Sequence, residues 1–282
     1  MRPIGNPARK PVGPMPDPVA LPSPTPKLRL TLDGAIATLA IDNPARRNAL
    51  DLEMWRAIPP MMDGLAGDER VRVLVVRGAG GGPFASGADI AEFETVRADS
   101  AGGQSYEADN EAAFDALARL PQPTIAAIRG FCLGGGFGLA LACDLRIAGG
   151  DAVFGIPAGR LGVGYPPGAM RMVVAAVGPA AAKDLFFTAR RIDAETARRL
   201  GVVRDVVAPE ALDAEVAALA QAIAANAPLT LRAAKAAIDE ATGVAGPNSG
   251  AVALAQACFD SDDYREGRTA FLEKRAPVFR GR

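Results

Sequence analysis

The sequence predicts an α/β protein that ends in a helical region. Strand-like apolar runs at 71–77 and 124–128 are separated by a helical stretch, and each run leads into a glycine-rich turn. From residue 211 onward the spacing of apolar residues is almost entirely helical. Hydrophobic residues make up 49% of the 282 residues, which is enough to bury a large core. Strands that alternate with helices at this spacing favour a largely parallel sheet.

The first 27 residues differ from the rest of the chain because they carry nine prolines and few apolar residues. We interpret 1–27 as a disordered or polyproline-like arm. It has neither the apolar centre of a secretory signal nor the Arg/Ser-rich pattern of a transit peptide. The sequence therefore divides into this arm, a core over 28–210, and a helical region over 211–282.

The core begins with a predicted β-hairpin, in which 28–32 and 36–41 flank Asp33-Gly34. A helix follows Asn48 and is expected to kink or break at Pro59-Pro60. The segment 97–110 is polar, and we expect it to be mobile. The remaining predicted elements, in chain order, are a strand over 71–77, a helix over 112–120, a strand over 124–128, a short helix that ends near 142, strands over 145–148 and 152–154, and helices over 211–224, over 229–241 and after 260.

The composition excludes several kinds of chemistry. The chain has no histidine, so Ser-His-Asp and Cys-His nucleophiles, the HExxH zinc site and most other histidine-containing metal sites are ruled out. Its three cysteines lack CxxC spacing, which indicates a reducing cytoplasm and small buried side chains. A formal net charge of −1 gives no general attraction to nucleic acid, and no apolar run is long enough for a membrane span.

Two glycine-centred turns, 84–90 and 130–138, lie on either side of a strand-like run. Each turn can aim a backbone N–H at the oxygen of a thioester as it becomes an enolate. In a site without water, two such donors strongly stabilise the negative charge that develops on this oxygen. The second turn is glycine-dense because a backbone that closely approaches a ligand and then enters a helix leaves no room for a Cβ. The pair indicates acyl transfer, hydration, isomerisation or decarboxylation of an activated acyl group.

The segments 43–50 and 84–90 and the run Gly134-Gly135-Gly136 resemble the crotonase, or enoyl-CoA hydratase/isomerase, superfamily. The resemblance covers about residue 28 to the end. It implies a spiral of ββα units with a C-terminal helical region, assembled as a homotrimer or a dimer of trimers. It also implies an acyl-CoA substrate that brings its own coenzyme A, with no other cofactor and no metal.

By position in these motifs, the resemblance assigns the oxyanion amides to Ala88 and Gly135. Contacts to acyl-CoA would fall on Ala88, Asp89, Ile90 and Ala91. Asp89 itself is expected to accept hydrogen bonds from amides of its own turn, as an acid at the start of a helix does.

Coenzyme A carries phosphates, so basic side chains should meet it. Our candidates are Arg46 and Arg47, which precede Asn48, and Lys274 in the last predicted helix. Lys274 lies far along the chain from the turns. We expect it to reach a site across folded layers or from a neighbouring subunit.

The sequence departs from hydratases at two positions. Hydratases of this superfamily carry glutamates at the positions of Gly138 and Ala158, where paired carboxylates divide the acid and base roles. The segments 161–165, 186–189, 260–264 and 271–275 are similar to methylmalonyl-CoA decarboxylases, in which a tyrosine at the position of Tyr165 holds the departing carboxylate. The sequence therefore favours decarboxylation of a malonyl-type acyl-CoA, with Tyr165 as the orienting residue. The alternatives are an enoyl-CoA hydratase that uses other groups and a non-catalytic acyl-CoA-binding subunit.

A rival interpretation is a dinucleotide-binding fingerprint, because 80–85 matches GxGxxA after a strong strand. Pro83 disturbs the tight entry into a helix that this fingerprint needs. No second strand that ends in an acid is predicted about 20 residues later.

Overall fold

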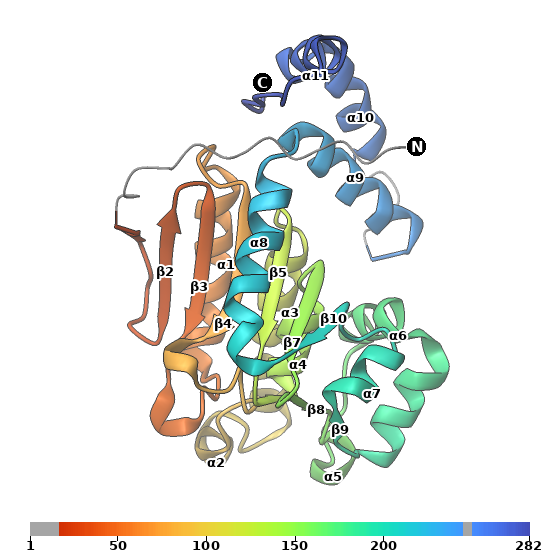
Figure 1. The fold of residues 1–282 in the computed structure, drawn as a ribbon. Helices are drawn as coiled ribbons and strands as arrows, with labels where there is room; N and C mark the ends of the chain where they lie inside the picture. Colours follow the sequence, from red (N-terminus) through yellow and green to blue (C-terminus); the bar gives the residue numbers. More distant parts are fainter. Residues whose placement is uncertain (1–16, 245–249) are drawn as a thin grey trace.

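The computed structural model describes residues 17–244 and 250–282, and its centre is a twisted, mostly parallel sheet (Figure 1). From β3 to the far edge all neighbouring strands are parallel, whereas β1, β2 and β3 pair antiparallel. The large sheet has the order β1 (Val19–Leu21), β2 (Leu28–Asp33), β3 (Ile36–Ile41), β4 (Val73–Gly78), β5 (Thr124–Ile128), β7 (Leu145–Gly149), β10 (Asp205–Val207), and a small sheet holds β6 (Phe131–Leu133), β8 (Val153–Gly155), β9 (Ile192–Asp193).

The predicted hairpin is confirmed. β2 and β3 pair in register from Leu28↔Ile41 to Asp33↔Ile36, and Gly34 supplies the positive φ of +57° that the tight turn requires. The strands predicted at 71–77 and 124–128 correspond to β4 and β5.

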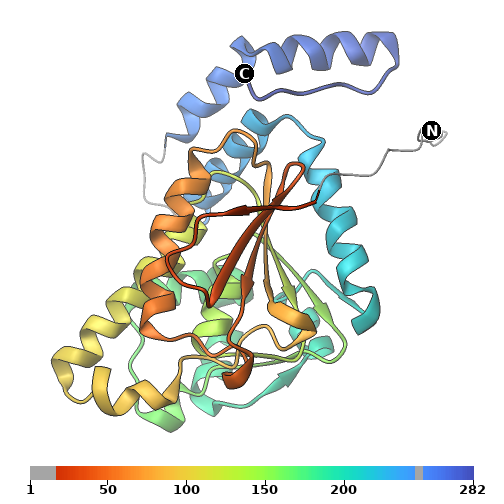
Figure 2. The ribbon, with the colours of Figure 1, turned by 90° about the vertical axis from the view of Figure 1, so that its left-hand side faces the viewer.

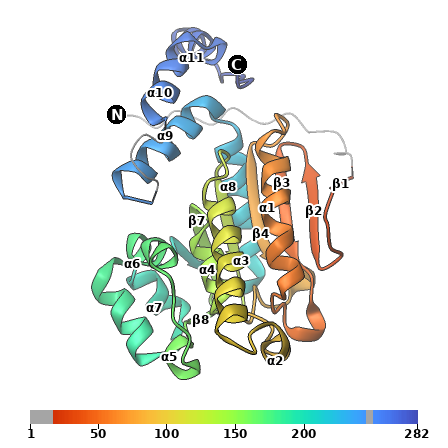
Figure 3. The ribbon, with the colours of Figure 1, turned by 180° about the vertical axis from the view of Figure 1, so that it is seen from behind.

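Helices cover both faces of the large sheet (Figures 1 and 3). The helices are α1 (Leu52–Ala66), α2 (Phe93–Val96), α3 (Ser100–Ala118), α4 (Gly135–Leu141), α5 (Ala158–Leu161), α6 (Pro167–Thr188), α7 (Ala194–Arg199), α8 (Leu212–Ala224), α9 (Pro228–Ala241), α10 (Ala251–Asp260), α11 (Asp262–Glu273).

The alternation of side chains along β4 shows how the two layers are filled. Val73 and Val75 pack into a cluster with residues of α8, whereas Leu74 and Val76 pack into the main core with residues of α1 and α3. Successive side chains of a strand point to opposite faces, so a continuous apolar run is needed for a strand that is covered on both sides.

Two local predictions need correction. α1 continues through Pro59 and Pro60, because its apolar face is buried along its whole length and packing outweighs the two missing amide donors. The segment 97–110, expected to be mobile, contains the first half of α3, which starts where the Asp99 carboxylate accepts a hydrogen bond from the Gly102 amide. The GxGxxA match at 80–85, against which the sequence already argued, ends at Ala85 in a bridge to Cys132, and the next helical turn starts only at Ile90.

The proline-rich arm is shorter than predicted. Val19–Leu21 form β1, which pairs with Leu30–Leu32 at the edge of the large sheet. Edge strands tolerate neighbouring prolines because only one side of the strand must donate hydrogen bonds. The prediction for residues 1–16 lies outside the described residues.

The C-terminal helices α9, α10 and α11 extend beyond the end of the sheet (Figures 1 and 2). They expose large apolar side chains, of which Phe271 is the most exposed at 84%. The main-chain oxygen of Phe279 accepts a hydrogen bond of 2.8 Å from Arg72, which ties the tail to the entrance of β4. Within the described ranges no single helix has the length and apolar character of a membrane span, although 209–224 and 228–241 together meet those criteria across a bend of 104°.

Candidate active site

The first glycine turn lies beyond the carboxyl end of β4 and is held against Leu50. The Leu50 amide donates to the Gly87 carbonyl oxygen at 2.9 Å, and the Asp89 amide donates to the Leu50 carbonyl oxygen at 2.9 Å. Successive amides of an extended chain point to opposite sides, so the N–H of Ala88 points away from Leu50. Ala88 lines a cavity that Gly135 and Tyr165 also line.

The second turn follows β6 and enters α4 at Gly135. The first amides of a helix have no partner within the helix, so the N–H of Gly135 is available to a ligand. Gly134 adopts φ +50° at this point, and its position lies beside the first turn, because a Cβ built on it would be 3.9 Å from the Cα of Gly87. Gly136 has no room for a side chain either, since a Cβ there would lie 2.5 Å from that of Ala85.

The structure therefore brings the two predicted oxyanion residues, Ala88 and Gly135, to one cavity. Tyr165 lines the same cavity from the segment between α5 and α6. Its ring packs edge-on against Phe186 with 5.2 Å between centroids, and burial raises the pKa of its phenol to about 12. Within the part of the chain that the structure describes, its hydroxyl has no hydrogen-bond partner, so it is free to contact a ligand.

One face of α3 supplies polar side chains to this cavity, and these side chains were not predicted from the sequence. Glu107, Asn110, Glu111 and Phe114 follow the i, i+3, i+4, i+7 spacing of a single helix face, and all four line the cavity. The i, i+3, i+4, i+7 spacing was the available signal. Because 100–110 contains two adjacent glycines and is polar, it was not predicted to be helical, and the spacing was therefore not recognised as one face of a helix.

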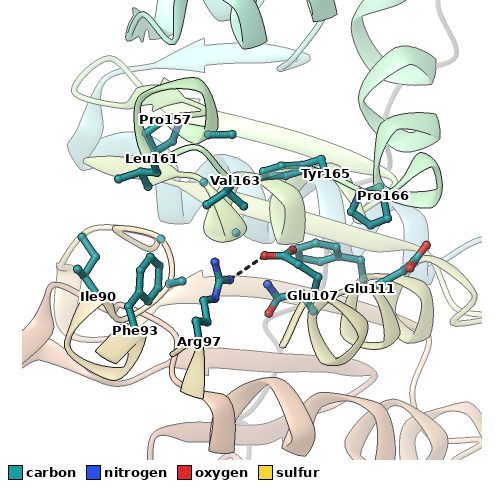
Figure 4. Close-up of a pocket in the computed structure, with 18 of the residues that line it drawn as sticks. Ile90, Phe93, Arg97, Glu107, Glu111, Pro157, Leu161, Val163, Tyr165 and Pro166 are labelled. Carbon is teal, nitrogen blue, oxygen red and sulfur yellow. Dashed lines mark ion pairs between the residues drawn. The ribbon is translucent and has the colours of Figure 1, made fainter. Parts of the chain in front are cut away.

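Glu107 forms an ion pair with Arg97, 2.8 Å between Oε1 and Nη2, and Figure 4 shows the two side chains pointing toward one another. Burial raises the pKa of Glu107, while the Arg97 charge and a hydrogen bond from Asn110 oppose that rise. The guanidinium of Arg97 also stacks on the ring of Tyr106, 3.9 Å from its centroid.

The two positions at which hydratases carry glutamate, 138 and 158, supply no carboxylate in this structure. A Cβ built on Gly138 would lie 2.6 Å from the Phe114 ring, so that ring fills the space which a side chain at 138 would need. Ala158 lines the cavity with a methyl group. The cavity nevertheless holds two carboxylates, because Glu107 and Glu111 line it from α3.

A second hollow adjoins the first and shares Ser86, Ala88 and Ile90 with it. It gathers six of the seven residues predicted to contact coenzyme A, which are Arg46, Arg47, Ala88, Asp89, Ile90, Ala91. Arg191, which precedes β9, also lines it and was not predicted.

Asp89 acts within its own turn, as expected, because its carboxylate accepts a hydrogen bond of 3.0 Å from the Ala91 amide. Lys274 is not in this hollow. It ends α11 on the C-terminal extension, so within one chain the structure does not bring it to the other predicted contacts.

A mostly parallel α/β sheet, with two glycine turns that meet in a cavity beyond the strand ends, is the architecture of the crotonase superfamily. A family model described as enoyl-CoA hydratase/isomerase matches residues 31–282. The chain belongs to the enoyl-CoA hydratase/isomerase family.

Individual relatives agree with this assignment. The chain is 37% identical to a crotonyl-CoA hydratase from Syntrophomonas wolfei subsp. wolfei, over 86% of this chain and 94% of that protein. It is 34% identical to a short-chain-enoyl-CoA hydratase from Clostridium acetobutylicum, over 87% of this chain and 94% of that protein. Among solved structures, an enoyl-CoA hydratase/carnithine racemase from Magnetospirillum magneticum superposes with a TM-score of 0.87 at 38% identity, covering 92% of this chain and 97% of that one.

Proposed function

We propose that this enzyme adds water to a 2-enoyl-CoA thioester through an enolate, with the thioester oxygen held by the amides of Ala88 and Gly135. The observation that carries the proposal is the cavity itself, in which these two amides and the carboxylates of Glu107 and Glu111 line one space. Amide donors stabilise the oxygen charge that develops, and a carboxylate moves the proton that hydration requires. Relatives named as crotonyl-CoA and short-chain-enoyl-CoA hydratases support this choice.

The adjoining hollow is the proposed coenzyme A cleft. Arg46, Arg47 and Arg191 would meet its phosphates, and the shared rim at Ala88 would carry the thioester into the cavity. Beyond Tyr165 the cavity meets a small apolar hollow lined by residues such as Leu141 and Met172. An apolar end wall of this kind suits a short hydrocarbon acyl chain.

Assembly belongs to the same proposal. The C-terminal extension exposes Phe259, Phe271 and Leu272, a set of apolar side chains that a second subunit would cover. We propose a homotrimer or a dimer of trimers in the cytoplasm, in which Lys274 approaches the coenzyme A cleft of a neighbouring subunit.

Decarboxylation of a malonyl-type acyl-CoA is the second candidate. The Tyr165 hydroxyl and the guanidinium of Arg97, both of which line the cavity, would offer donors to a substrate carboxylate. The two cavity glutamates oppose this candidate, because they would repel a substrate that carries an additional negative charge.

The deciding experiment incubates the purified protein with crotonyl-CoA and methylmalonyl-CoA and follows the products by mass spectrometry. Gain of water on crotonyl-CoA is the expected result. Loss of carbon dioxide from methylmalonyl-CoA would show that the enzyme is a decarboxylase and that the proposed hydration is wrong. Tight binding without conversion of either thioester would identify a non-catalytic acyl-CoA-binding subunit.

A further inference from the structure

We infer that Glu107 is the residue that moves the proton in this cavity, in place of the carboxylates missing at 138 and 158, and that Arg97 positions it. This inference rests on the proposed function. It is carried by the placement of Glu107 on the cavity face of α3, by its ion pair with Arg97, and by the packing that closes position 138 to any side chain.

The alternative sources of a base in the cavity are few. Position 138 cannot supply one because the Phe114 ring occupies its space, and Ala158 has only a methyl group. Tyr165 keeps its proton, since burial raises the pKa of its phenol to about 12. Among the described residues that line the cavity, the carboxylates of Glu107 and Glu111 remain.

Glu107 and Glu111 have different surroundings. A Cβ built on Gly168 would lie 1.8 Å from Oε1 of Glu111, so this carboxylate packs against the first turn of α6. Figure 4 shows Glu111 beside Pro166, whereas Glu107 points toward Arg97. Burial raises the pKa of Tyr165, and the charge of Glu107 raises it further.

Arg97 holds the carboxylate of Glu107 in one orientation. Its guanidinium stacks 3.9 Å from the centroid of Tyr106 and 4.4 Å from that of Phe93, and its side chain is only 12% exposed. A planar cation fixed by two rings and bonded to the carboxylate limits the rotamers of Glu107. Burial without this cation would favour the protonated acid, so Arg97 also keeps Glu107 available as a base.

The proton follows a balanced path. The Glu107 carboxylate takes a proton from a water whose oxygen bonds to C3 of the enoyl thioester. The electrons of the C2=C3 bond move toward the carbonyl, and the resulting enolate oxygen is held by the amides of Ala88 and Gly135. Glu107 then gives the proton to C2, the enolate collapses to the thioester, and one water has been added.

The test compares Glu107→Gln with Glu111→Gln, which makes the same change in the same cavity, and with Glu94→Gln on the exposed side of α2. The readouts are hydration of crotonyl-CoA, exchange of the C2 protons of butyryl-CoA in deuterated water, and binding of butyryl-CoA. General acid–base catalysis contributes about 10²–10⁴-fold, so Glu107→Gln should lose at least about a hundredfold in hydration and exchange. Its binding of butyryl-CoA should stay intact, and Glu94→Gln should match the wild type.

Arg97→Lys tests the positioning role through the pH profile. A less well-placed cation lets burial raise the pKa of Glu107 further, so the acid limb of kcat/KM should move to higher pH than in the wild type. Glu107→Asp keeps a carboxylate and should retain a pH-dependent residual rate. It keeps the test decisive if Glu107→Gln does not fold.

The outcomes separate the two proposals. If the wild type neither hydrates crotonyl-CoA nor exchanges C2 protons, both the proposed function and this inference are wrong. If the wild type is active and Glu107→Gln keeps its rate, or Glu111→Gln shows the larger loss, the inference alone is wrong. An unchanged acid limb in Arg97→Lys would remove Arg97 from its positioning role.

Discussion

Replacing Gly138 by alanine should destabilise the protein by about 1 kcal/mol, although a glycine-to-alanine change inside a helix usually stabilises. The usual gain is roughly 0.5–1 kcal/mol because alanine loses less backbone entropy. At Gly138 the new Cβ would lie 2.6 Å from one atom of the Phe114 ring and 3.0 and 3.1 Å from two others. Overpacking of this kind costs about 1–3 kcal/mol.

The Phe114 ring has little freedom to move aside. It is 4% exposed and meets Trp55 edge-on, with 5.6 Å between ring centroids. The overpacking penalty should therefore exceed the entropic gain. Gly64 in α1 is the matched control, because a Cβ built there meets nothing within 4 Å. Gly64→Ala should stabilise by roughly 0.5–1 kcal/mol.

The assay is urea unfolding of both variants, with Phe114→Leu and the double variant Gly138→Ala/Phe114→Leu completing a cycle. The smaller leucine should relieve the contact, so the two changes together should cost about 1 kcal/mol less than the sum of the single costs. If Gly138→Ala stabilises as much as Gly64→Ala does, the ring does not fill this space. Steric exclusion by Phe114 would then fail to explain why position 138 carries no carboxylate.

Tyr165→Phe should lower kcat by up to about tenfold, which corresponds to the loss of one hydrogen bond. The melting temperature should not change, because the ring keeps its contact with Phe186. Unaltered kinetics would show that the hydroxyl contacts no reacting group. Arg191→Ala should weaken the binding of free coenzyme A several-fold in calorimetry, since an exposed cation contributes about 1 kcal/mol. The effect should be smaller at high salt, which screens the charge. Equal affinities of the variant and the wild type at low salt would contradict the proposed cleft. Burial raises the pKa of the thiols of Cys132 and Cys143, so a disulfide reagent such as DTNB should label only Cys258 rapidly in the folded protein and all three cysteines after unfolding.

The sequence was a good guide where local chemistry decides the structure. The hairpin at Asp33-Gly34 and the buried strand β4 follow from a turn signal and an apolar run. Glycine spacing likewise identified the turns at Ala88 and Gly135, which line one cavity. Their role as oxyanion donors stays a prediction. The similarity to methylmalonyl-CoA decarboxylases stays a prediction.

The sequence was a poor guide where tertiary packing decides. α1 keeps its helix through Pro59 and Pro60 because its buried face holds it against the core. The cavity face of α3 could not be read from 97–110, since polar residues at helical spacing usually face solvent. Only the packing of α3 beside α4 shows that Glu107 faces a cavity instead.

Glu107 and Phe114 lie on the same face of α3, seven residues apart, and this links the carboxylate that α3 brings into the cavity to the missing side chain at 138. Two helical turns separate them, so a register of α3 that points Glu107 into the cavity also points the Phe114 ring at Gly138. A glutamate at 138 would need that ring to leave, and its departure would also remove the edge-on contact with Trp55. A glutamate side chain at 138 on α4 and the Phe114 ring on α3 therefore cannot occupy this space together. The proposed proton-transfer group, Glu107 on α3, is compatible with this packing.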